Sequence, residues 1–126
     1  MNNMTVKKGR IEIKAKAILV GDDLCIIISG GDRPHIGCVT LSIPRPGISD
    51  SSKNSATTSV MNITGHKDDE AARYVSQTLA SALNKNVVVT CGIHLDNITN
   101  EEIDETLVLI KELTDQLIEA FLIEPR

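Results

Sequence analysis

The chain has 126 residues, a mass of 13.6 kDa and a formal net charge of −4. This length predicts one domain spanning residues 1–126, large enough to bury a single core without metal or disulfide staples. The only aromatic residues are Tyr74 and Phe121. Because single-stranded nucleic acids are bound through aromatic stacking and cationic grooves, this composition argues against a nucleic-acid partner.

The sequence also bears on the compartment. No segment has the length of an apolar membrane span, and the first residues lack a hydrophobic signal region. We therefore expect a cytoplasmic protein without membrane contact. Three cysteines lie within apolar runs and are expected to be reduced, buried thiols rather than a disulfide framework: Cys25, Cys38 and Cys91.

The first strands are predicted by alternation and turn residues. Polar and apolar residues alternate from 10 to 17, which is typical of a strand with one face in water. Turn residues at 21–23 lead into the apolar run 24–28, and the two strands are expected to form a hairpin. Three further strands are predicted, at residues 36–43, 57–64 and 86–93.

The stretch from Pro44 to Ala56 contains almost nothing to bury. We expect a long surface loop here, joining the third and fourth strands. Loops of this length often act as lids over a site. A tolerated insertion without function is an equal alternative.

Helical spacing replaces alternation in two segments. From 67 to 84, apolar residues recur every three or four positions, and Asp68-Asp69-Glu70 occupy the first turn. We interpret these three acids as partners of the helix dipole in preference to a carboxylate cluster for acid–base catalysis. In the final helix, Thr99 and Glu102 have the spacing of a capping box.

The element order is four strands, a helix, a strand and a helix. This order predicts the α+β class: a mixed, mostly antiparallel five-stranded sheet with both helices packed on one face. Strands two, three and four are expected to form an antiparallel meander. A right-handed crossover through the first helix would place the fifth strand beside the fourth and parallel to it.

This routing brings the three histidines of the chain to one rim of the sheet. His35 follows the second strand, His66 precedes the first helix and His94 follows the fifth strand. Both helix N-termini are expected at the same rim, where exposed amides favour an anion, especially a phosphate. Arg33 and Lys67 could add donors, and the predicted rim is therefore electropositive.

Three interpretations of the histidines remain open. Together with Asp96 they could bind a divalent metal, because neutral imidazoles are common ligands for zinc and related ions. They could instead hydrogen-bond the phosphate or the polar ring of a cofactor. Each could also be a turn histidine satisfied by backbone. The sequence contains no nucleophile elbow, P-loop or Rossmann fingerprint.

Three segments carry a family resemblance. They are Gly30-Gly31 followed by His35-Ile36-Gly37, then Gly65-His66-Lys67-Asp68-Asp69-Glu70, then Gly92-Ile93-His94-Leu95-Asp96-Asn97-Ile98. The pattern resembles the LpdD-like family of prenylated-flavin chaperones, typified by a small protein associated with gallate decarboxylase, and spans about residues 10–122. The resemblance implies a protein that binds prenylated FMN, or FMN, and supports its maturation or delivery to a UbiD-type decarboxylase.

The leading hypothesis is thus a non-catalytic cofactor-binding accessory protein. We expect these residues to contact the flavin: Gly31, Arg33, His35, Gly65, His66, Lys67 and His94. With so few aromatic residues, the flavin ring would rest on aliphatic or backbone surface, and the loop at 44–56 is a candidate cover.

Two rival hypotheses stay open. A small metal-dependent hydrolase or lyase would use His35, His66 and His94, with Asp96 as a further metal ligand. An assembly subunit would stabilise a decarboxylase and bind no ligand. In addition, we expect a homodimer, because the last helix carries apolar residues outside its main stripe: Val108, Ile118 and Leu122.

Overall fold

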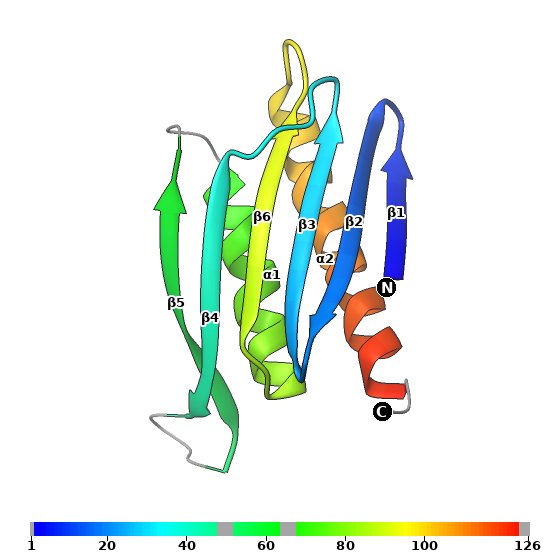
Figure 1. Ribbon diagram of the computed structural model, residues 1–126. Helices are drawn as coiled ribbons and strands as arrows, with labels where there is room; N and C mark the ends of the chain where they lie inside the picture. Colours follow the sequence, from blue (N-terminus) through cyan, green and yellow to red (C-terminus); the bar gives the residue numbers. More distant parts are fainter. Residues whose placement is uncertain (1, 48–51, 64–67, 124–126) are drawn as a thin grey trace.

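The computed structural model describes residues 2–47, 52–63 and 68–123. Within these residues, six strands and two helices follow one another in the chain (Figure 1). Their bounds are β1 Asn2–Lys8, β2 Ile11–Val20, β3 Asp23–Gly31, β4 Cys38–Pro46, β5 Asn54–Asn62, α1 Asp68–Leu83, β6 Val87–His94 and α2 Asn100–Ile123. The predicted α+β class is confirmed, with one strand more than expected.

Both helices pack on the same face of the sheet, as predicted. Helix α1 lies against β4, β5 and β6, while α2 lies against β1, β2 and α1. The layer between sheet and helices is mainly aliphatic, and Ile13, Ile26 and Leu113 are fully buried there. Burying each such side chain contributes about 1.5–3 kcal/mol. Tyr74 and Phe121 only border this core.

The order of strands corrects the predicted meander. The sheet runs β1-β2-β3-β6-β4-β5, so β6 lies between β3 and β4, which do not pair. Strand β6 is parallel to β3 and antiparallel to β4. Because β5 is also antiparallel to β4, β5 and β6 run in the same direction as expected, but they are not neighbours. The apolar β6 gains burial from this central position, with Val87, Val89 and Cys91 fully buried.

Both ends of the expected long loop are strand. Strand β4 continues to Pro46 and β5 begins at Asn54, with Pro44 opposite Ala56 in the register. The β4–β6 ladder ends at Ser42, so the prolines lie where β4 has one neighbour, a position that tolerates a missing N–H. The end of β4 at Pro46 and the start of β5 at Asn54 lie at the end of the sheet opposite the C-terminal ends of β3 and β6 (Figure 1). The prediction that this loop covers the histidine rim is therefore wrong.

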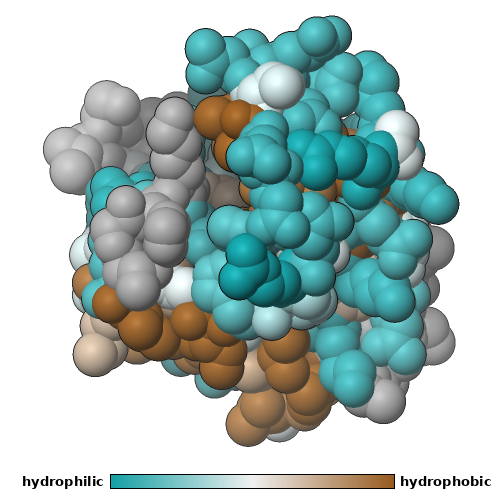
Figure 2. All heavy atoms as spheres, turned by 90° about the horizontal axis from the view of Figure 1, so that it is seen from above, coloured by the Kyte–Doolittle hydropathy of each residue, from teal (hydrophilic) through white to brown (hydrophobic). Residues whose placement is uncertain are grey.

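Neither of the two described helices covers the second face of the sheet. Alternation leaves large apolar side chains exposed on this open face, among them Ile27, Leu41, Ile43 and Met61. In the view onto the rim, hydrophobic atoms follow one edge of the molecule while hydrophilic side chains dominate the rest (Figure 2). Within the described part of the chain, no helix combines the length and the apolar character that crossing a membrane requires.

Candidate functional site

The rim of the sheet gathers chain segments that are far apart in the sequence. Strands β3 and β6 end here side by side, with Gly31 opposite His94, and β4 begins here. The connection from β3 to β4 carries His35 and is tied to β6 by a hydrogen bond from Gly37 N–H to the Cys91 carbonyl, 3.0 Å long. The structure thus brings His35 and His94 to one rim, as the predicted routing required.

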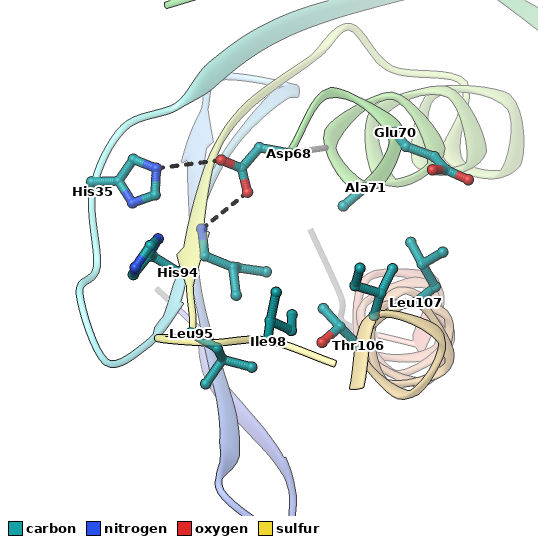
Figure 3. A pocket seen from close by; sticks show the side chains of 11 residues that line it. His35, Asp68, Glu70, Ala71, His94, Leu95, Ile98, Thr106 and Leu107 are labelled. Carbon is teal, nitrogen blue, oxygen red and sulfur yellow. Dashed lines mark hydrogen bonds and ion pairs between the residues drawn. The ribbon is translucent and has the colours of Figure 1, made fainter. Parts of the chain in front are cut away.

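A pocket of about 380 Å³ opens at this rim. It lies between the first turn of α1, the end of β6 and the first turns of α2 (Figure 3). Most of its wall is aliphatic, formed by Ala71, Ile93, Leu95, Ile98, Ile103 and Leu107. The polar or charged lining residues are His35, Asp68, Glu70, His94 and Thr106. Figure 3 shows both histidines on one side of the pocket and Glu70 on the other.

Asp68 connects α1 with the histidine side of the pocket. It is only 8% exposed, and its Oδ1 accepts a hydrogen bond from Ile93 N–H at 3.1 Å. Its Oδ2 lies 3.3 Å from Nε2 of His35. This contact is an ion pair without hydrogen-bond alignment, and Oδ2 accepts no hydrogen bond from the described residues. The buried carboxylate therefore depends on the His35 ring for its second contact.

Two glycines allow this close packing. A side chain at Gly37 would overlap Asp68 Oδ2, and one at Gly92 would overlap the backbone carbonyl of His35. Both positions are buried. Only glycine leaves room for a second group to approach the backbone so closely. The segments around these glycines are among those that carried the family resemblance.

The arginines of the rim are already paired. Arg33 donates to Asp96 at 2.9 Å, and Arg10 forms two hydrogen bonds with Glu102, of 2.6 and 2.9 Å. Arg10 also lies 3.5 Å from Asp32. Among the described residues, the expectation of an electropositive rim is thus wrong, because each arginine there faces a carboxylate.

These ion pairs displace the pKa values of the carboxyl groups. Hydrogen bonds from Arg33 and from His94, whose Nε2 is 3.0 Å from Oδ1, lower the pKa of Asp96. The hydrogen bond from Arg10 lowers the pKa of Glu102 to about 2, with further help from Thr99. Both carboxylates stay ionised at neutral pH and hold the β3–β4 and β6–α2 connections together.

The structure bears on the predicted state of the cysteines and on the predicted metal site. All three cysteines are free thiols, and burial raises the pKa of Cys38 and Cys91, so both are unreactive at neutral pH. Within the described ranges, no three His, Cys, Asp or Glu side chains gather as a metal centre would require.

Not every predicted site residue can be placed. Gly31, Arg33, His35 and His94 lie at the rim, and His35 and His94 line the pocket. Gly65, His66 and Lys67 lie outside the described residues. Sequence reasoning missed Asp68 and the aliphatic lining, because an acid in a first helical turn is usually a dipole partner. The hydrophobic residues on either side of the Thr99 cap are the sequence feature that could have indicated the aliphatic lining.

Comparisons with known proteins agree with this picture. The family described as the prenylated flavin chaperone LpdD-like domain matches residues 7–122. Protein LpdD of Lactiplantibacillus plantarum is 25% identical over 118 residues, covering 94% of this chain and 83% of that protein.

A solved structure shares the fold. It comes from the crystal structure of a chaperone complex for yeast 20S proteasome assembly, with a TM-score of 0.59, 17% identity and 92% of both chains covered. At this identity, the likeness concerns the fold alone. Since the family match covers nearly the whole sequence, the chain belongs to the LpdD-like family of prenylated flavin chaperones.

Proposed function

We propose that this protein binds prenylated FMN in the rim pocket and delivers it to a UbiD-type decarboxylase. The observation that carries the proposal is the pocket itself, an aliphatic cavity with two imidazoles at one side, in a chain of this chaperone family. The role is binding and delivery in the cytoplasm, without turnover by the protein. Gly31, Arg33, His35 and His94 contribute from the described rim, and Gly65, His66 and Lys67 belong to the same proposal.

The pocket suits such a ligand in size and chemistry. Its volume of about 380 Å³ lies within the range of roughly 300–1,000 Å³ usual for small-molecule sites. The aliphatic wall offers apolar contact to a ring system and to the carbons of a prenyl group. The histidine side offers N–H donors to oxygen atoms, whereas the carboxylate of Glu70 on the other side would repel a phosphate.

The test is to load the protein in the cell. The chain is produced together with a flavin prenyltransferase, purified without an affinity tag and examined by absorbance and mass spectrometry. We expect stoichiometric prenylated FMN on the wild type and on Lys53→Ala, an exposed control at the other end of the sheet. The double variant His35→Ala/His94→Ala should lose most of it. Wild-type protein without flavin would refute the proposal, and a stoichiometric divalent metal in its place would favour the hydrolase or lyase.

Two finer parts of the proposal concern partners. Loaded protein should restore activity to an apo UbiD-type decarboxylase faster than free prenylated FMN at equal concentration, and no difference would count against delivery. We also propose a homodimer. The apolar side chains of Val108 and Leu122 on α2 are more than half exposed, and a second copy of the chain could bury them. Ile118, in contrast, packs against the core. Light scattering at the monomer mass would contradict the dimer.

A further inference from the structure

A continuous apolar patch lies on the open face of the sheet. The strand register aligns its side chains in two rows, which cross β2, β3, β6, β4 and β5 in that order. The first row consists of Ile18, Cys25, Val88, Leu41 and Ser59. The second row consists of Lys16, Ile27, Thr90, Val39 and Met61. Most of these side chains are apolar, and the patch therefore reaches from β2 to β5.

Polar side chains border this patch. Strands β1 and β2 carry the exposed Lys7 and Lys14 at one margin, and β5 carries the exposed Thr57 and Ser59 at the other. Figure 1 shows the sheet in front of both helices, and in the view from above hydrophobic residues follow that side of the molecule (Figure 2). A contiguous apolar patch with a polar border is typical of an interaction surface.

The area of the open face matches what a stable dimer needs. The sheet has six strands, of seven to ten residues each. With about 4.8 Å between strands and about 3.3 Å per residue, the face measures about 29 by 28 Å, or about 800 Å². Stable interfaces bury about 800 Å² on each partner. The patch occupies the middle of this area, where an interface needs its apolar core.

We propose that the open face binds a second copy of this chain, with the two sheets packed face to face. Sheets packed in this way lie about 10 Å apart, with strand directions within about 30° of each other. A two-fold axis parallel to the strands sets the patch of one copy on the patch of the other. It also keeps Lys14 and Lys16 of the two copies at opposite margins of the interface, where their ammonium groups reach water.

The exposed apolar residues of α2 offer no comparable surface. Val108 and Leu122 are separated by fourteen positions, which is about 21 Å along the helix. Single exposed apolar side chains are common on protein surfaces. The dimer through the sheet rests on the homodimer of the proposed function, but not on flavin binding.

The first experiment compares one substitution on each surface. Leu41→Lys places a charge in the centre of the patch, and a two-fold interface would contain that charge twice. Val108→Lys makes the same change on α2, at a side chain that is also exposed. Dimer dissociation is measured by sedimentation over a dilution series. We expect Leu41→Lys to weaken the dimer at least tenfold and Val108→Lys less than twofold.

The outcomes separate the interface from the homodimer. A wild-type monomer would overturn both. A dimer that Val108→Lys weakens and Leu41→Lys does not would overturn the sheet interface alone. Circular dichroism checks the fold of each variant, and Ile43→Lys, on the same face and half exposed, replaces Leu41→Lys if that variant does not fold.

Cys25 provides a second readout, because it lies within the patch. It is partly exposed in the single chain, whereas Cys38 and Cys91 are buried. In the dimer, Cys25 should be shielded from a thiol reagent. We expect it to react at least tenfold more slowly in dimeric wild type than in Leu41→Lys, and faster when the wild type is diluted. Equal rates in both proteins at all concentrations would contradict the sheet interface.

Other occupants of the face, and the flavin role itself, are tested with the same variant. Leu41→Lys should load prenylated FMN as wild type does, because the pocket lies at the rim between the sheet and the helices. A sheet dimer without flavin would refute the flavin role and leave the interface standing. A monomeric wild type that binds the decarboxylase or phosphatidylglycerol vesicles, and loses this binding in Leu41→Lys, would assign the face to that partner and overturn the sheet dimer.

Discussion

The carboxylate of Glu102 caps helix α2 and also binds Arg10. Its Oε1 accepts from Thr99 N–H at 3.1 Å, which completes the cap of α2, and both oxygens accept from Arg10 in the turn between β1 and β2. The Arg10 guanidinium also donates to the carbonyl of Asp96. Through Arg10, the first turn of α2 is thereby joined to the β1–β2 turn and to the connection that follows β6. The two hydrogen bonds between Arg10 and Glu102 require the ionised form of Glu102.

This requirement predicts a loss of stability in acid. The pKa of Glu102 is lowered from 4.5 to about 2 in the folded protein, so its contribution is complete above pH 4.5 and disappears as the pH falls toward 2. In urea unfolding at pH values from 7 to 3, the free energy of unfolding should fall more steeply with decreasing pH for wild type than for Glu102→Gln. Glu101→Gln, the same change at an exposed neighbour, should follow wild type. Parallel curves for wild type and Glu102→Gln would disprove the role.

For single residues, the sequence predicted contacts only between residues that are close to each other in the chain. The capping box of Thr99 and Glu102 was predictable because three residues separate them, and the structure confirms both bonds. The contact between Asp68 and His35 joins residues 33 positions apart. No spacing rule reports such a contact, so Asp68 was interpreted as a dipole partner.

Among the elements, both helices and the five strands β2 to β6 had clear patterns in the sequence. Strand β1 was missed because it has only Met4 and Val6 to bury and lies at the edge of the sheet. The insertion of β6 between β3 and β4 was also unpredicted, because strand neighbours that are not consecutive depend on how the whole core packs. The prediction that His35 and His94 lie at one rim is nonetheless correct. Strand β6 is parallel to β3, and both strands therefore end at the rim.

The start of α2 supplies a prediction for one element. Thr99→Ala removes the side-chain acceptor of the Glu102 amide, 3.1 Å away, and should lower the free energy of unfolding by about 1 kcal/mol (range roughly 0.5–2). Ser81→Ala removes an exposed hydroxyl inside α1 and should leave stability unchanged or raise it, because alanine favours helix interiors. Equal effects of the two substitutions in urea unfolding would contradict the capping account.

For the whole molecule, the fold places the pocket at one end of the sheet. One end of the sheet carries the pocket, His35, His94 and the starts of both helices, while the end of β4 and the start of β5 lie at the other end (Figure 1). The likeness to a chain of a proteasome-assembly chaperone complex indicates that this scaffold is used elsewhere. The function proposed for this chain therefore depends on the pocket and not on the fold.

The most direct measurement is to map where prenylated FMN binds. Nitrogen-15-labelled protein is titrated with the cofactor, and the backbone amide shifts are followed. The largest, saturable changes should fall on residues that line the pocket, such as Ile93, Ile98 and Leu107. Amides at the opposite end, such as Asn84 and Lys85, should not change. Changes centred on the open face around Ile27 and Leu41, or no saturable change, would contradict the account.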